Sequence, residues 1–268
     1  MNDGSGPKAG GPERPAFEEG LRRFTPQIKR IVNFALFPKK VVGHGVGHVP
    51  ETGPVILVSN HCGAIKDPAA LYRIISRPLF FNANRMLFNR AELDFLIRKH
   101  LRRHFKSYGL ALDRMLGPFK TMFVRFVSTN IARVGTIPAD MYDQSNRAAV
   151  ALFMEYLRAG RVLVSMQGRG RVHPDERNPY VKTFGCGVPY IAYRLKTEEG
   201  LDVPVVPLSI FGTQRPWGIP GRIQVNIGPP LFIRDHLGGD SDAVVERFRF
   251  ALQTAVERLL NESLGDSF

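Results

Sequence analysis

The chain has 268 residues, 44% of them hydrophobic, which is enough to build a substantial core in one α/β domain or two small ones. Its net charge of +13 predicts an acidic partner, which leaves an anionic membrane, a phosphorylated substrate, an acidic carrier protein or nucleic acid as candidates. Two cysteines exclude a disulfide framework, and no apolar run approaches the roughly 18 residues that a membrane-spanning helix needs.

The N-terminal 40 residues divide into two parts. Residues 1–15 are rich in glycine and proline, which predicts a flexible leader. Residues 16–40 contain a predicted amphipathic helix, because apolar side chains between Leu21 and Leu36 recur at mostly helical spacing with basic residues among them. Pro38 ends this helix, and a glycine-rich connector over residues 42–53 leads to the rest of the chain.

The most informative stretch runs from Val55 to Pro68. Four apolar residues, Val55–Val58, predict a buried strand, Gly63 permits a bend, and Asp67 followed by proline has the form of a helix cap. His61 lies at the end of the strand, six positions before Asp67, so the two side chains can meet only across a non-helical turn.

A histidine beside a carboxylate is the usual arrangement of a general base. The imidazole takes a hydroxyl proton, and the carboxylate fixes its tautomer. The alternative is that Asp67 only caps the helix and His61 is an ordinary polar residue at a strand end. Cys62 suggests a thiol nucleophile, but adjacent side chains usually point apart, and a small buried thiol is the commoner role.

A second strand is predicted at Pro78–Phe81, followed by two segments of mixed apolar and basic character. Residues 91–106 form a basic amphipathic helix, a pattern typical of a segment that lies on anionic lipid, although an ordinary surface helix with a basic face has the same pattern. In residues 110–127 the aromatic side chains fall at helical spacing and look buried, which does not favour binding of nucleic acid.

A predicted strand at residues 130–134 contains Arg133, and a helix over residues 146–159 follows it. The next strand, residues 161–166, leads into Gln167-Gly-Arg-Gly-Arg171. Glycines that expose backbone N–H groups, together with guanidinium groups, suit the capture of a phosphate at a strand end. The alternative is a plain basic turn.

The remaining segments complete an alternating pattern of strands and helices. Turn residues at 184–188 precede a short helix over 189–195; strands follow at 203–211 and 222–227, and the last helix covers 241–261. This alternation predicts one α/β domain, residues 41–264, with a largely parallel central sheet flanked by helices.

At these motifs the chain resembles the glycerolipid acyltransferases, the family of the lysophosphatidic acid and glycerol-3-phosphate acyltransferases. The first motif of that family is Asn-His, four residues and Asp, whereas Asn60-His61 is followed here by five residues before Asp67. Its third motif is Pro-Glu-Gly-Thr-Arg. Gly168 matches the glycine, Gln167 stands in place of the glutamate, and Gly170 holds the position of the arginine. The strand 203–211 with Gly212 resembles the fourth motif, and the resemblance covers residues 40–262.

The resemblance implies transfer of a fatty acyl group from acyl-CoA or acyl carrier protein to a hydroxyl of a lysophospholipid, with no cofactor and no metal. It implies His61 and Asp67 as catalytic residues, and as substrate-binding residues Asn60, Arg133, Gln167, Gly168, Arg169 and Arg171. It also implies a peripheral protein on the cytoplasmic face of an anionic membrane. The substituted third motif leaves a thioester hydrolase open, and the longer first motif leaves open a non-catalytic lipid-binding protein of the same fold.

Overall fold

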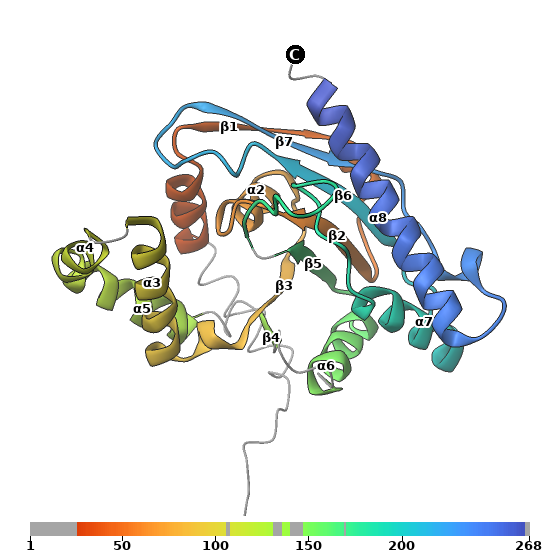
Figure 1. Ribbon diagram of the computed structural model, residues 1–268. Coiled ribbons are helices and arrows are strands. Elements are labelled where there is room, and N and C mark those ends of the chain that lie inside the picture. Colours follow the sequence, from red (N-terminus) through yellow and green to blue (C-terminus); the bar gives the residue numbers. More distant parts are fainter. Residues whose placement is uncertain (1–25, 106–107, 131–135, 140–146, 169, 266–268) are drawn as a thin grey trace, which may run out of the picture. The chain divides into compact units, whose positions relative to one another are not determined.

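The computed structural model describes residues 26–105, 108–130, 136–139, 147–168 and 170–265. They fall into two compact units (Figure 1). The sheet unit comprises residues 27–82 and 141–268, and the helical unit includes residues 83–140. The candidate catalytic residues His61 and Asp67 both belong to the sheet unit.

The sheet unit is built on six strands in the spatial order β1-β7-β6-β2-β5-β3. Their bounds are β1 (Lys39–His44), β2 (Val55–His61), β3 (Leu79–Asn84), β5 (Val162–Gly168), β6 (Val205–Phe211) and β7 (Gly221–Ile227). The four strands β6, β2, β5 and β3 run parallel, whereas β7 is antiparallel to β6 and carries β1 parallel to itself. The predicted largely parallel α/β fold is confirmed.

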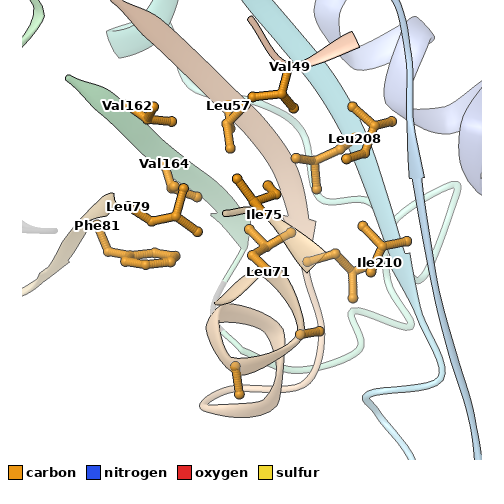
Figure 2. Packing of buried hydrophobic residues seen from close by; sticks show 14 of the residues in the cluster. Val49, Leu57, Leu71, Ile75, Leu79, Phe81, Val162, Val164, Leu208 and Ile210 are labelled. Carbon is orange, nitrogen blue, oxygen red and sulfur yellow. The ribbon is translucent and has the colours of Figure 1, made fainter. Parts of the chain in front are cut away.

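One face of this sheet packs against α2 (Lys66–Ile74) and against a helix formed by residues 26–36. Side chains alternate between the two faces of a strand, so every second residue of β2 and β5 enters this core. Figure 2 shows Leu57, Val164 and Leu208 from three strands meeting Leu71 and Ile75 from the α2 segment. This packing holds α2 against the face of the sheet, next to the end of β2.

The intervening residues of the strands, such as Ile56 and Leu163, are buried on the opposite face. Three helices cover that face: α6 (Arg147–Arg158), α7 (Gly187–Glu199) and α8 (Ser241–Gly265). Helix α8 packs on β6 and β7, α6 packs on β5, and α7 joins the two helices (Figure 1). Because both faces are covered, the central strands are apolar along nearly their whole length.

The helical unit contains η2 (Arg85–Phe88), α3 (Arg90–Phe105), α4 (Gly109–Met115), α5 (Gly117–Asn130) and the short strand β4 (Ile137–Ala139). Helix α3 packs on both α4 and α5. The expectation that the aromatic residues of this segment are buried is wrong, because Phe119 is 68% exposed and Phe123 is 44% exposed.

The N-terminal part of the chain differs from the expectation at one strand and can be compared with it only from residue 26 onward. The strand β1 lies where the sequence predicted the end of a helix and a glycine-rich connector. The predicted N-terminal helix is present over residues 26–36, and the leader and residues 16–25 lie outside the described residues. Over the part of the chain that the structure describes, none of the helices has both the length and the apolar character needed to cross a bilayer.

Candidate active site

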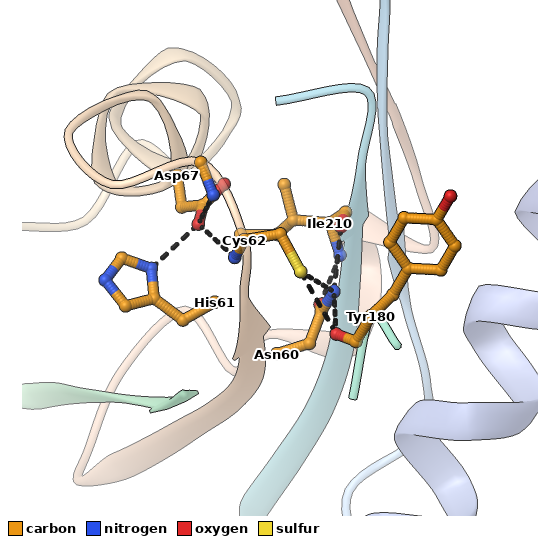
Figure 3. A network of polar contacts seen from close by, with 7 residues as sticks. Asn60, His61, Cys62, Asp67, Tyr180 and Ile210 are labelled. Carbon is orange, nitrogen blue, oxygen red and sulfur yellow. Dashed lines mark hydrogen bonds and ion pairs between the residues drawn. The ribbon is translucent and has the colours of Figure 1, made fainter. Parts of the chain in front are cut away.

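The candidate site lies at the carboxyl end of the central strand β2. His61 is the last residue of that strand, and Asp67 lies in the first turn of α2. The Nδ1 atom of His61 is 2.7 Å from Oδ2 of Asp67, so the two side chains are hydrogen-bonded (Figure 3). The non-helical turn that the sequence required therefore brings the histidine and the carboxylate together.

Asp67 is completely buried, and the turn before it supplies hydrogen-bond donors. Its Oδ2 atom accepts the backbone N–H groups of Cys62 at 2.9 Å and Gly63 at 2.8 Å, in addition to His61. The positive end of the α2 dipole also favours an anion in the first turn. The prediction that Asp67 is the helix cap is wrong: Ile65 holds the cap position, and the carboxylate binds the preceding turn instead.

The five-residue spacing is accommodated by an unusual backbone conformation. Ala64 has a φ of +49°, in the left-handed region that non-glycine residues seldom adopt. Gly63 lies so close to the loop after β6 that a β-carbon on it would be 2.2 Å from Cβ of Thr213. Glycine at 63 and the left-handed residue at 64 together let the chain turn back, so that Asp67 reaches His61.

These contacts determine which nitrogen of His61 is available for chemistry. With the Asp67 carboxylate as acceptor, Nδ1 is the protonated nitrogen, so Nε2 of the neutral ring is an acceptor. The side chain is 22% exposed, and Figure 3 shows the ring directed away from the buried contacts of Asn60 and Cys62. A partly exposed imidazole with a buried carboxylate behind it has the geometry of a general base.

Asn60 lies directly before His61 and is fully buried. Its amide nitrogen donates to the carbonyl oxygens of Ile210, at 3.0 Å, and Tyr180, at 3.2 Å, and its Oδ1 accepts the N–H of Ile210 at 2.8 Å. The side chain therefore ties the end of β2 to β6 and to the loop that contains Tyr180. Its predicted role in substrate binding remains a prediction.

Cys62 is also buried, and its thiol donates to the carbonyl oxygen of Tyr180 at 3.1 Å. Burial, together with the negative charge of Asp67, raises the pKa of this thiol to about 12. A thiol with such a pKa is protonated at neutral pH and is a poor nucleophile. The geometry therefore favours the structural role of Cys62 over the nucleophilic one.

The end of β5 forms the neighbouring wall of the site. Gly168 is paired in register with His61 and has a φ of +133°, and a β-carbon on it would lie 2.8 Å from the carbonyl oxygen of His61. Gln167 uses its Oε1 atom to accept the N–H of Gly185 at 3.1 Å, and its Nε2 atom to donate to Ser165 Oγ at 3.0 Å. Gly168 thus lies beside His61, whereas Gln167 is paired with Asn60 and its side chain contacts Gly185 and Ser165. The predicted role of both residues in substrate binding stays a prediction.

Of the three arginines predicted to bind phosphate, Arg171 is the one that lies within the described residues. Arg171 is exposed and lies three residues after the end of β5. Arg133 and Arg169 lie outside the described residues. Their role in binding stays a prediction.

Two residues of the site were not predicted. Thr213 follows Gly212 after β6 and packs against the Gly63 turn. Lys66 lies between His61 and Asp67, and its Nζ donates to the carbonyl oxygen of Arg215 in the same loop, while burial and the nearby charge of Lys39 lower its pKa. The signal for Thr213 was its position directly after the strand that resembles the fourth motif, but only the fold places that loop beside Gly63.

A cleft at the opposite end of the sheet is distinct from this site. His44 and His48 line it together with Asn226 and Arg258, at the carboxyl ends of β1 and β7, which run against the central strands. His48 has its Nδ1 2.8 Å from the carbonyl oxygen of Ile227. Among the described residues, no group of three histidine, cysteine or acidic side chains is arranged to hold a metal ion.

Comparison with known proteins gives a likeness of fold. No protein-family model and no curated protein matches the chain. Among solved structures, the crystal structure of the 1-acyl-sn-glycerophosphate (LPA) acyltransferase PlsC from Thermotoga maritima matches over 91% of this chain and 82% of its own, with a TM-score of 0.51 and 19% sequence identity. The resemblance inferred from the sequence motifs is thus confirmed at the level of the fold, which is that of this acyltransferase.

Proposed function

We propose that the chain is an acyltransferase, which moves a fatty acyl group from acyl-CoA or acyl carrier protein to a hydroxyl of a lysophospholipid such as lysophosphatidic acid. The observation that carries this proposal is the 2.7 Å contact between His61 and Asp67 at the carboxyl end of β2. Ligands of open α/β sheets bind at this end of the strands. A solved structure with the same fold is that of an acyltransferase for 1-acyl-sn-glycerophosphate.

In the proposed reaction, Nε2 of His61 removes the proton from the acceptor hydroxyl as its oxygen attacks the thioester carbonyl carbon. The resulting tetrahedral intermediate collapses: the new C–O ester bond remains, the C–S bond breaks, and the leaving thiolate takes the proton back from His61. Asp67 holds the Nδ1 proton and stabilises the imidazolium that forms in between. No acyl-enzyme is required.

The Gly168 backbone and the basic segment that follows it are proposed to face the acceptor headgroup. The absence of a β-carbon at Gly168 keeps the backbone open beside His61. Arg133, Arg169 and Arg171 are the proposed partners of the phosphate, because guanidinium groups bind phosphate through paired hydrogen bonds. The +13 charge of the chain supports an acidic lipid as the substrate and an anionic membrane surface as the place of reaction.

The test is the formation of phosphatidic acid from long-chain acyl-CoA and lysophosphatidic acid, followed by mass spectrometry, with acyl carrier protein as the second donor. His61→Ala should lower kcat by about 10²–10⁴-fold, because it removes the base. Asp67→Asn should lower it by a similar factor, because an amide can stabilise the wrong tautomer. His44→Ala, which changes an exposed histidine of β1, is the matched control and should leave kcat unchanged.

The outcomes separate the alternatives. Free fatty acid formed without acceptor, and lost in His61→Ala, would identify a thioester hydrolase that uses the same base. Wild-type protein that binds lipid vesicles but forms neither product with either donor would identify a non-catalytic lipid-binding protein and overturn the proposal.

A further inference from the structure

The helical unit exposes several large apolar side chains along α4 and α5, which follow one another in the chain. Five of these side chains are called the apolar face below, and each is at least 44% exposed: Leu110 (55%), Met115 (69%), Phe119 (68%), Met122 (66%) and Phe123 (44%). Clustered exposure of large apolar side chains is unusual for a surface that contacts only water, and such patches mark docking sites.

The orientation of α5 is fixed from its other side. Phe119, Met122 and Phe123 are spaced i, i+3 and i+4, so they share one side of the helix. Val124, on the inner side, is only 5% exposed, and the side chain of Lys120 is only 9% exposed. The exposure of the apolar face is thus part of a defined packing of the helix.

An ion-pair network holds Lys120 in that inner position. Its Nζ lies 2.9 Å from Oδ1 of Asp94 on α3 and 2.5 Å from Oδ1 of Asp113 on α4. Arg98 contacts the same Asp94 at 2.7 Å. A mostly buried ammonium group needs these carboxylates, so α5 cannot rotate its apolar face inward without leaving the charge unpaired.

The charge around the apolar face is strongly positive. Residues 83–130 hold ten lysine and arginine residues against three acidic ones, a net charge of +7 and more than half of the excess of the whole chain. Asp94 and Asp113 are engaged by Lys120 and Arg98. The exposed charges that remain are mostly cationic: Lys99, Arg102, Arg114 and Arg125.

We propose that the apolar face docks this protein on an anionic lipid surface, with Phe119, Met122 and Phe123 inserted among the acyl chains and the surrounding cations on the lipid phosphates. Amphipathic helices with this combination of side chains bind at the membrane interface. A second copy of the chain fits this face poorly, because residues 83–130 carry a net charge of +7 and would face the same positive charge on the other copy. The inference deepens the proposed function, on which it rests for its biological purpose.

The experiment is flotation of the full-length protein with vesicles of phosphatidylcholine alone and of phosphatidylcholine with phosphatidylglycerol. Wild type should bind the anionic vesicles, and bind them less at high salt. Phe119→Asp and Met122→Asp should each weaken binding by about tenfold or more, because each removes an inserted side chain and adds a repelled charge. Circular dichroism checks that the variants are folded. If Phe119→Asp does not fold, Phe119→Ser is the milder substitution to use in its place.

Two further variants show whether vesicle binding depends on the apolar face or on another exposed aromatic side chain. Phe250→Asp changes a 65% exposed phenylalanine on α8 in the sheet unit and should bind as wild type. Phe34→Asp tests a second exposed aromatic group, in which the ring of Phe34 lies 5.1 Å from that of Trp217. Loss of binding in Phe34→Asp, with wild-type binding in both variants of the apolar face, would overturn the proposal.

The remaining outcomes are also decisive. His61→Ala should bind vesicles as wild type does, so the docking surface is tested whether or not the protein proves to be an acyltransferase. Equal binding to vesicles with and without phosphatidylglycerol would contradict an anionic surface as the partner. A wild-type dimer that Phe119→Asp converts to a monomer, with vesicle binding unchanged, would instead identify the apolar face as a protein interface and overturn the proposal.

Discussion

At the scale of single residues, the contact between His61 and Asp67 depends on how the turn between them closes. The first motif of the glycerolipid acyltransferases has four residues between the histidine and the aspartate, and this chain has five. The sequence therefore predicted the pairing only if the additional residue bulged near Gly63. The structure makes that adjustment at Ala64, the neighbouring residue, through a φ of +49°. Sequence alone could not place it, because the conformation depends on packing of the turn against Thr213.

Gly63→Ala tests this closure. The new methyl group would lie 2.2 Å from Cβ of Thr213 and 2.7 Å from Oδ1 of Asp67, so the turn must shift. We expect the free energy of unfolding to fall by about 1–3 kcal/mol, from overpacking, and the acyl-transfer rate to fall more than stability alone explains. Urea denaturation and steady-state kinetics measure the two effects.

The control for this variant is Gly47→Ala. A β-carbon at Gly47 meets no atom within 4 Å, so stability and rate should remain at wild-type values. A Gly63→Ala protein with wild-type kinetics would mean that the tight turn does not position Asp67.

Substitution of Asn60 distinguishes a structural role, in which its side chain holds β2 against β6, from the predicted role in substrate binding. Asn60→Ala removes three hydrogen bonds and leaves buried backbone groups of Ile210 unpaired, so the free energy of unfolding should fall by about 3 kcal/mol. Asn33→Ala, at an exposed position of the 26–36 helix, is the control and should change it little. Unchanged stability together with a raised KM for the acceptor would support direct substrate binding instead.

At the scale of elements, the sequence predicted β2, β3, β5, β6 and β7 to within a few residues, because each is a short apolar run between turn signals. It missed β1, in which lysines and a glycine interrupt the apolar pattern. That strand is defined by its pairing with β7, far along the chain, and by Lys39, whose buried Nζ donates to the carbonyl oxygens of Pro216 and Ile219. Contacts at such separations leave no local pattern.

The segment 110–127 shows a second limit of periodicity. Its apolar spacing correctly indicated helix, although Gly117 and Pro118 divide it into α4 and α5. Spacing cannot tell which side of a helix is turned inward when both sides have candidates. Here the ion pairs of Lys120 with two carboxylates decide it, and they leave the aromatic side exposed.

Lys120→Met tests the ion-pair network. Asp94 and Asp113 would then face each other without the ammonium group, so the helical unit should unfold at a lower temperature, as followed by circular dichroism at pH 7. Lys99→Met removes an exposed lysine of α3 and is the control, for which we expect little change. Equal melting of the two variants would contradict a structural role for Lys120.

The same network predicts a pH dependence. The hydrogen bond from Lys120 holds the pKa of Asp113 below its usual value near 3.8. A carboxyl whose pKa is lower in the folded state stabilises that state above the unfolded pKa and loses this effect as the pH falls through the folded pKa. The stability difference between wild type and Lys120→Met should therefore be full at pH 7 and shrink below about pH 4.

At the scale of the whole molecule, the alternation of strands and helices was sufficient to predict the fold class, and the motif order was sufficient to predict the acyltransferase fold that the solved structure of PlsC shares. The exposure of the apolar face on α4 and α5 could be seen only in the structure. His61 and Gly168 lie at the ends of the adjacent parallel strands β2 and β5, and Asp67 lies on the helix that follows β2, so two motifs more than 100 residues apart in the sequence meet at one end of the sheet.

Whether His61 is the base of an acyl transfer is tested by measuring thiol release from long-chain acyl-CoA or acyl carrier protein, with and without lysophosphatidic acid, in wild type and His61→Ala. Transfer with His61 as the base predicts release that depends on the acceptor, matches the ester formed mole for mole, and falls by about 10²–10⁴-fold in the variant. Release in wild type that is independent of the acceptor, or that persists at full rate in His61→Ala, would show that the protein does not transfer acyl groups with His61 as the base.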